Sequence, residues 1–342
     1  MSSHVVQGAA ATNHKTFGEQ ALHYFSREHG GIAREPLDTP AAWRGPDIAG
    51  RSDWIVGLSS AEIAELERAR DAVRARGLGL GEMRREDFPL STLAPAIATW
   101  ARELRDGRGF LLVRGLPVDR WGDDDAALVY WGLGLHLGVP GAQNPAGDLL
   151  GHVADMGEEA SSPFVRRYRT RGDIAYHCDL ADVVGLLCLR TPRSGGASRI
   201  ASSVAVYNEL LRRRPDLVDR LYEPFLLDTR DEDGEGRLPY VPVPPCRYAH
   251  GRLKTFYHSD YFRSVVRHAS APPFTADEQT LLDLYEEIAC SPEIYLDMQF
   301  EPGDVQLLSN HVVLHARTAY EDFAEPARKR HLLRLWLSLA PA

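Results

Sequence analysis

A His-x-Asp pair and a histidine more than a hundred positions further along the chain restrict the folds that this sequence can adopt. In an extended strand, side chains two positions apart point to the same face, so His177 and Asp179 can bind one ion together. A third ligand must come from a distant segment. His315 ends a stretch with a β pattern and is a candidate, and His311 lies on the same face as its rival. Such a site requires strands that pair across a long stretch of sequence.

Two imidazoles and one carboxylate on one side of a metal ion leave its other side open, as in non-haem Fe(II) oxygenases. An isolated His-x-Asp is more often a polar pair at a strand end. The last predicted strand of the chain, however, favours a metal site. There, leucines alternate with Arg330 and Arg334, so the leucines would pack on helices and the arginines would share the opposite face. Inside a barrel, two such guanidinium groups would bind a dicarboxylate; a solvated edge strand is the alternative.

Taken together, five segments resemble the taurine dioxygenase (TauD/TfdA) family of Fe(II)- and 2-oxoglutarate-dependent oxygenases. The resemblance covers the chain from about Gly109 to the C-terminus. The segments are YHCD at 176–179, SGGAS at 194–198, PGDV at 302–305, HART at 315–318 and RHLLRLW at 330–336.

The resemblance implies a role for each matching residue. His177, Asp179 and His315 would bind Fe(II), because the His-x-Arg-Thr context favours His315 over its rival. Arg330 would bind the distal carboxylate of the co-substrate 2-oxoglutarate, and Ser198 would add a hydrogen bond where the family often has threonine. O2 would take the remaining metal position. Related halogenases carry a small residue in place of the aspartate, so halogenation is disfavoured.

The primary substrate is expected to be a small organic molecule with an acidic group, such as an amino acid or a biosynthetic intermediate. Arg334 corresponds to an arginine that meets such a group in several family members, and a structural ion pair is the alternative. Asn144, Asp173 and His258 are further candidate contacts. The same metal site would serve hydroxylation, desaturation, epoxidation or ring closure. A non-oxidative, cupin-type metal-binding barrel, acting as an isomerase or sensor, is the alternative function.

The predicted fold is mainly β with flanking helices, around a double-stranded β-helix (jelly-roll) core. Residues 1–50 are expected to form a loosely ordered arm that covers part of the molecule, and residues 51–342 a single oxygenase domain. A proline-rich lid or loop is expected around 234–252, with four prolines between 238 and 245. Helices are predicted at 60–76, 93–104, from 123, at 203–222 with a break at proline 215, and at 275–289; strands are predicted at 110–114, 183–189, 304–308, 311–315 and 330–339.

Composition limits the partners and the compartment. The formal net charge of −9 disfavours binding to nucleic acid or to an anionic membrane surface, which favours a small-molecule partner. The four cysteines show neither CxxC spacing nor the density of a disulfide-rich domain, and no basic start with a following apolar run opens the chain. A cytoplasmic protein without a membrane span is therefore predicted, and a homo-oligomer remains open.

Overall fold

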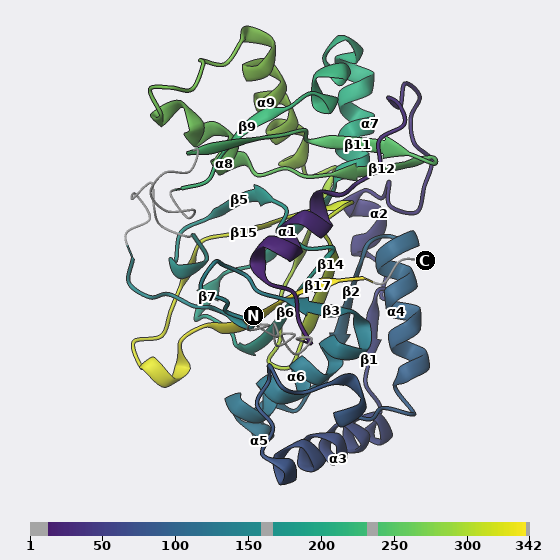
Figure 1. Cartoon of the computed structure of the whole chain (residues 1–342), viewed down its shortest axis with the longest axis vertical. Coiled ribbons are helices and arrows are strands. Elements are labelled where there is room, and N and C mark those ends of the chain that lie inside the picture. The colour runs from purple at the N-terminus through teal and green to yellow at the C-terminus, as the bar shows by residue number, and fades with distance from the viewer. Residues whose placement is uncertain (1–12, 159–166, 231–238, 340–342) are drawn as a thin grey trace, which may run out of the picture.

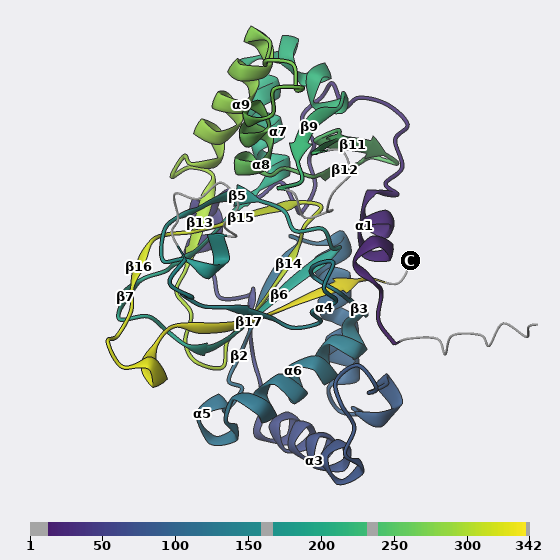
Figure 2. The same cartoon turned by 60° about the vertical axis from the view of Figure 1, so that its left-hand side comes forward.

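The computed structural model describes residues 13–158, 167–230 and 239–339, and two β-sheets lie at the centre of the molecule (Figures 1 and 2). The larger sheet has the order β1-β2-β14-β6-β17-β3, with β4 also pairing with β17. Its pairs are antiparallel except for β1 with β2. Its strands are β1 (Ile55–Gly57), β2 (Phe110–Arg114), β3 (Val139–Gly141), β4 (Gly151–Val153), β6 (Val183–Arg190), β14 (Val305–Ser309) and β17 (His331–Ser338).

The smaller sheet is antiparallel, with the order β13-β8-β15-β5. Apolar residues of both sheets form one core, in which Phe110 and Leu308 of the larger sheet belong to the same cluster as Ile200 and Val313 of the smaller one. Strands that are distant in sequence therefore pair and face each other, which confirms the jelly-roll core. The strands of this sheet are β5 (Ile174–His177), β8 (Ser198–Ser202), β13 (Tyr295–Met298) and β15 (Val313–Arg317).

One group of helices covers the outer face of the larger sheet, at the bottom and the right-hand side of Figure 1. The three leucines at 333, 335 and 337 of β17 pack in this helical layer, as the alternation in sequence predicted, whereas Trp336 packs between the two sheets. The predicted capped helix is present, with Ser59 and Glu62 forming a capping box and Gly77 ending the helix at φ 65°. These helices are α3 (Ser60–Arg76), α4 (Ala94–Asp106), α5 (Val118–Trp121) and α6 (Asp123–Leu137).

A second group of helices packs beside the smaller sheet, at the top of Figure 1. The expected break at Pro215 separates α7 (Ser203–Arg213) from the 3-10 helix η3 (Pro215–Tyr222). Among the described helices, none is long and apolar enough to cross a bilayer. The other elements of this group are α8 (Ser259–Ser264), η4 (Val265–Arg267) and α9 (Ala276–Ala289), and short elements elsewhere are β7 (Ser194–Gly195), β16 (Tyr320–Glu321), η1 (Arg85–Asp87), η2 (Arg167–Arg169) and η5 (Pro326–Arg328).

The expectation of a loosely ordered arm over residues 1–50 is wrong for its described part, which starts at residue 13. This part contains α1 (Phe17–Phe25) and α2 (Gly45–Ala49), and the side chain of Tyr24 is fully buried. The physical reason is that α1 begins at a capping box at Thr16 and buries Gln20 and Tyr24 on one side of the helix. Residues 1–12 lie outside the described part of the chain.

The proline-rich segment also differs from the expected loop. Residues 234–238 of this segment lie outside the described part, and the rest contains β10 (Tyr240–Val243), β11 (Cys246–Ala249) and the start of β12 (Arg252–Thr255). β10 pairs with β9 (Phe225–Asp228), and β11 with β12, in two-stranded sheets. Pro242 is tolerated because β10 has a partner on one side only.

Candidate metal centre

The small sheet brings the two candidate histidine ligands together. β15 pairs with β5 so that His315 lies directly opposite His177, and their ring centroids are 4.0 Å apart. Asp179 follows two residues after His177, and one ligand atom from each of the three residues lies within 4.8 Å of the others. This is the facial arrangement of two imidazoles and one carboxylate.

Local hydrogen bonds fix the orientation of these ligands. The Nδ1 atom of His177 lies 3.0 Å from the carbonyl oxygen of Ala175, which directs Nε2 to the other side of the ring. The backbone N–H of Asp179 donates to Oδ1 of Asn310 at 3.0 Å, and Asn310 donates to the carbonyl oxygen of Ala181. Asn310 thus holds the turn that carries the carboxylate. Sequence reasoning missed this residue.

The two oxygens of Asp179 have different surroundings. Oδ1 accepts a hydrogen bond from Nη1 of Arg334 at 3.3 Å, whereas Oδ2 is buried without a hydrogen-bond partner among the described residues and lies 3.7 Å from Nε2 of His315. This buried carboxylate oxygen faces an imidazole but makes no hydrogen bond with it. A divalent cation bound between the two groups would explain the arrangement. The residues present therefore fit a metal ion.

The protonation states also suit a metal. Burial, and then the neighbouring His177, lower the pKa of His315 to about 3, so its imidazole is neutral. Burial alone would raise the pKa of Asp179, but Arg334 and the two imidazoles outweigh this effect and leave the pKa below its usual value. Metal ligation requires a neutral imidazole and an ionised carboxylate, and the pKa shifts of His315 and Asp179 favour these forms.

The rival ligand His311 lies outside this cluster. Its Nε2 atom is 2.8 Å from Oδ1 of Asp182, and its ring stacks on Tyr24 with the centroids 4.8 Å apart. The structure therefore brings His315, and not His311, to His177 and Asp179.

Arg330 and Ser198 lie in a buried polar region that contains the start of β8. Arg330 is 4% exposed, and its Nη1 atom has no hydrogen-bond partner in the described chain. A Cβ atom on Gly196 would lie 3.4 Å from Nε of Arg330, so the Gly-Gly bend approaches the guanidinium group closely. The hydroxyl of Ser198, in contrast, donates to Oε1 of Gln306 at 3.0 Å.

A second buried arginine, which sequence reasoning did not select, lies near Arg330. Arg317 donates from Nη2 to the carbonyl oxygens of Thr170 and Gly172, and its Nε and Nη1 atoms have no hydrogen-bond partner among the described residues. Both guanidinium groups lie against the ring of Tyr320, at 4.8 and 5.0 Å from its centroid. Burial, and then Arg330, lower the pKa of Arg317 to about 10. Two buried cations with unsatisfied donors fit the carboxylate of an organic acid.

Beside the metal cluster lies a cavity of about 360 Å³. It is lined by His177 and Asp179, by Arg334 and Trp336 of β17, and by residues of α1 and of the β9–β10 hairpin. Much of this lining is apolar. Its remaining residues are Phe17, Gly18, Ala21, Phe25, Gln143, Arg167, Tyr168, Ile174, Cys178, Leu180, Leu227, Asp228, Thr229, Val241, Phe256, His258, Asp260 and Tyr261.

Arg334 lines this cavity while it also contacts protein groups. Its Nε atom donates to Oε1 of Gln143 at 2.7 Å, and its guanidinium group lies between the rings of Tyr168 and Trp336. The structural ion pair with Asp179 is thus present. Sequence reasoning selected Asn144, and not the adjacent Gln143, as a candidate substrate contact.

The other candidate substrate contacts fall in different places. Asn144 does not line the cavity and instead bonds Asp148 in a turn, because its side chain points away from the face that Gln143 occupies. Asp173 is exposed, and its Oδ1 accepts a hydrogen bond from the backbone N–H of Ala319, so it supports a loop. In this structure, neither of these two side chains lines the cavity. His258 does line the cavity, with its ring centroid 5.0 Å from that of His177.

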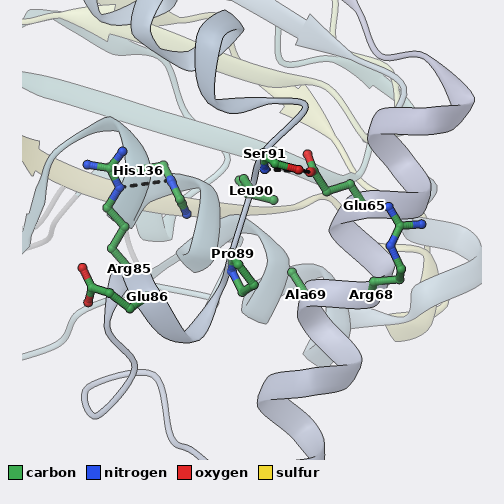
Figure 3. A pocket seen from close by; sticks show the side chains of 9 residues that line it. All are labelled: Glu65, Arg68, Ala69, Arg85, Glu86, Pro89, Leu90, Ser91 and His136. Carbon is green, nitrogen blue, oxygen red and sulfur yellow. Dashed lines mark hydrogen bonds between the residues drawn. The ribbon is translucent and has the colours of Figure 1, made fainter.

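A second, more open groove of about 600 Å³ lies on the helical layer (Figure 3). None of the three metal-cluster residues lines it. Glu65 in this groove accepts hydrogen bonds from the backbone N–H groups of Ser91, Thr92 and Leu93, and His136 lies 2.6 Å from the carbonyl oxygen of Phe88. Its polar groups thus serve the local structure.

Comparison with known proteins agrees with this geometry. The sequence profile described as "Taurine catabolism dioxygenase TauD, TfdA family" matches residues 74–336. FR-33289 synthase of Streptomyces rubellomurinus (strain ATCC 31215) is 30% identical over 311 residues, which cover 90% of this chain and 92% of that protein. Taurine hydroxylase-like protein SAT17 of Stachybotrys chartarum (strain CBS 109288 / IBT 7711) is 29% identical over 309 residues, 87% of this chain and 79% of that protein.

Among solved structures, an asparagine oxygenase in complex with Fe(II), 2S,3S-3-hydroxyasparagine and succinate is similar in fold. Its TM-score is 0.65 at 18% sequence identity, with 84% of this chain and 100% of that chain covered. At this identity the likeness shows a shared fold.

Proposed function

The chain belongs to the TauD/TfdA family of dioxygenases, and on that basis we propose that His177, Asp179 and His315 hold the iron of a dioxygenase that hydroxylates a small acidic substrate. The enzyme class is that of 2-oxoglutarate-dependent non-haem iron dioxygenases. The observation that carries the proposed site is the convergence of one ligand atom from each residue within 4.8 Å, beside a cavity of about 360 Å³. We further propose that residues 51–342 act as a single oxygenase domain.

When bound, Fe(II) with 2-oxoglutarate and O2 supplies the oxidising chemistry: one oxygen atom enters a substrate C–H bond, and the other enters succinate as CO2 is released. The chain itself binds and orients. Arg330 binds the distal carboxylate of 2-oxoglutarate with its unsatisfied Nη1 donor, and Ser198 adds a hydrogen bond when its hydroxyl turns from Gln306 to the carboxylate. Arg317 adds a second positive charge near Arg330, so that the co-substrate relieves the repulsion between two buried cations.

Two observations support an acidic, amino-acid-like substrate. Arg334 presents a guanidinium group to the cavity on the side of the metal cluster, and among the described residues only its Nε and Nη1 atoms are seen to donate hydrogen bonds. Taurine, named in one relative, and 3-hydroxyasparagine, bound in the solved oxygenase, each combine an amine with an acidic group. A non-oxidative barrel would form no succinate, so O2-dependent succinate release separates the two functions.

The proposed metal site can be tested without knowing the substrate. Anaerobic addition of Fe(II) and 2-oxoglutarate should produce the visible charge-transfer band of the chelated complex in the wild-type protein. His177→Ala and His315→Ala should lose the band, because each removes a ligand. His311→Ala is the matched control and should keep it, since this ring bonds Asp182 instead. Loss of the band in His311→Ala with retention in His315→Ala would reverse the assignment.

The co-substrate site is tested by the same band. Arg330→Ala should weaken 2-oxoglutarate binding about 10- to 100-fold, as expected when charge-assisted hydrogen bonds to a buried carboxylate are lost. Titration of the band with 2-oxoglutarate measures the change. Arg190→Ala, in which a β6 arginine paired with Asp123 is removed, should leave the affinity unchanged. Equal effects in both variants would contradict a specific role for Arg330.

A further inference from the structure

The N-terminal helix α1 forms one wall of the cavity beside the metal cluster. Phe17, Gly18, Ala21 and Phe25 all line this cavity, together with His177. They precede the segment that matches the family profile, which begins at residue 74. The wall is therefore contributed by a part of the chain outside the region that defines the family.

This wall is fixed in place from its other side. The hydroxyl of Tyr24 donates to the backbone carbonyl of Asn310 at 2.9 Å, and Asn310 also positions the backbone of the metal-ligand turn. At the preceding residue, Nε2 of His23 lies 2.8 Å from Oδ2 of Asp182. Because both contacts are partly or fully buried, α1 acts as a rigid wall of the cavity.

The face that α1 turns to the cavity is an incomplete apolar surface. Phe17, Ala21 and Phe25 lie four residues apart on one side of the helix, and each is only half-buried, although Tyr24 on the adjacent side is fully buried. An apolar stripe inside a concave site gains free energy when a ligand removes it from water.

The rest of the cavity lining also favours an apolar, uncharged group. Ile174, Leu227 and Val241 add apolar side chains to the lining. The two acidic residues that line the cavity away from the metal are already paired, Asp228 with Arg267 at 2.8 Å and Asp260 with Arg167 at 3.2 Å. A cationic substrate side chain would therefore find no free carboxylate among the described lining residues outside the metal cluster.

We propose that the stripe Phe17–Ala21–Phe25 of α1 determines specificity by selecting a substrate with an apolar carbon chain, whose acidic group lies on the Arg334 side of the cavity. This inference rests on the proposed function, since it concerns the primary substrate of the same site. The residues of the stripe act by shape and apolar contact and take no part in the chemistry.

Two homologous series of compounds serve as probes: straight-chain L-2-amino acids from alanine to 2-aminooctanoate, and straight-chain aminoalkanesulfonates from taurine upwards. Binding is measured by calorimetry under anaerobic conditions, on enzyme loaded with Fe(II) and 2-oxoglutarate. In the wild type, affinity should rise about fourfold per methylene until the chain meets the wall, and then stop rising. L-Arginine and L-lysine should bind more weakly than uncharged chains of similar length.

Two reciprocal variants and one control locate the wall. Ala21→Phe fills the cavity from α1 and should move the best chain length down by about two methylenes. Phe25→Ala opens the cavity and should increase the chain length that binds best. This second variant keeps the test valid if Ala21→Phe folds poorly. Leu22→Phe changes the neighbouring residue, which is 72% exposed, and should behave as the wild type.

The outcomes separate the inference from the proposed function. If the charge-transfer band forms in all four proteins but the best chain length is the same in all of them, the role of α1 is overturned and the dioxygenase site stands. Stronger binding of arginine or lysine, or no binding by any member of either series, also overturns the inference. Failure of the wild-type protein to form the band overturns the proposed function instead.

Discussion

Asp179 divides its two oxygens between different partners, and this division gives Arg334 a role beyond substrate binding. Oδ1 is bonded to Arg334, and Oδ2 faces the imidazole of His315. A ligand carboxylate whose second oxygen is held by a guanidinium group has fewer orientations to lose on metal binding. Arg334 is thus a positioning residue for the metal site, whatever it contributes to the substrate.

Replacement of Arg334 by alanine should therefore weaken Fe(II) binding. We expect a loss of about 10- to 100-fold, the usual effect of removing a group that orients a metal ligand. Anaerobic titration with Fe(II) in the absence of substrate measures it. Arg199→Ala removes an arginine paired with Asp297 at the sheet margin and is the control. Unchanged Fe(II) affinity in Arg334→Ala would mean that the arginine serves the substrate alone.

The sequence predicted the site residues that short spacing and strand alternation bring together, although Asp179 lies just beyond the end of β5. His177 and Asp179 lie two positions apart, and the alternation of β17 directs Arg334 and Trp336 inwards. Sequence reasoning missed Asn310 and Arg317, because their roles depend on which loop packs against them. It also selected Asn144 in place of Gln143, since a Gly/Pro-rich loop does not show which of two adjacent polar side chains turns inwards.

The same contrast holds for whole elements. The capped helix α3, the helix interrupted at Pro215 and the strands β6, β14 and β17 were predicted because caps, prolines and alternation act locally. α1 was missed because its apolar stripe spans only nine residues within a segment rich in glycine and charge. β10 was missed because prolines disfavour a central strand, whereas this strand pairs on one side only.

Helix α3 also stabilises the turn that precedes α4, through a single buried carboxylate. Burial would raise the pKa of Glu65, but hydrogen bonds from Thr92, Ser91 and Leu93 outweigh it and lower the pKa to about 2. Because the folded-state pKa lies below the unfolded value, this contribution is fully present above the unfolded pKa. It is lost as the pH falls from about 5 towards 2.

The Glu65→Gln variant should therefore lose about 3 kcal/mol of its free energy of unfolding at pH 7. The wild-type protein should lose about 1 kcal/mol of this contribution between pH 7 and pH 4, and the variant should lack that component. Urea unfolding at the two pH values measures both effects. Glu86→Gln, on the exposed side of the same groove, is the control. Parallel pH dependences in wild type and Glu65→Gln would show that the hydrogen bonds do not discriminate between the carboxylate and the amide.

Across the whole molecule, the proposed active site joins the two sheets. His177 and His315 come from β5 and β15 of the smaller sheet, whereas Arg334 belongs to β17 of the larger one. The ion pair of Arg334 with Asp179 crosses from one sheet to the other. A metal bound by the three ligands would therefore connect β5 to β15 directly and, through Asp179, to β17.

Because this site exists only when both sheets are assembled, metal binding should stabilise the whole fold. At a free metal concentration about 100 times the dissociation constant, the gain is about 2.7 kcal/mol, which for a chain of this size raises Tm by roughly 3–5 °C. Thermal unfolding with and without Fe(II), under anaerobic conditions, or with redox-stable Mn(II), measures the shift. A chelator should reverse it. The His315→Ala variant should show little shift, and His311→Ala should keep it, because only the former removes a ligand. A shift of the same size in His315→Ala would place the stabilising metal elsewhere in the protein.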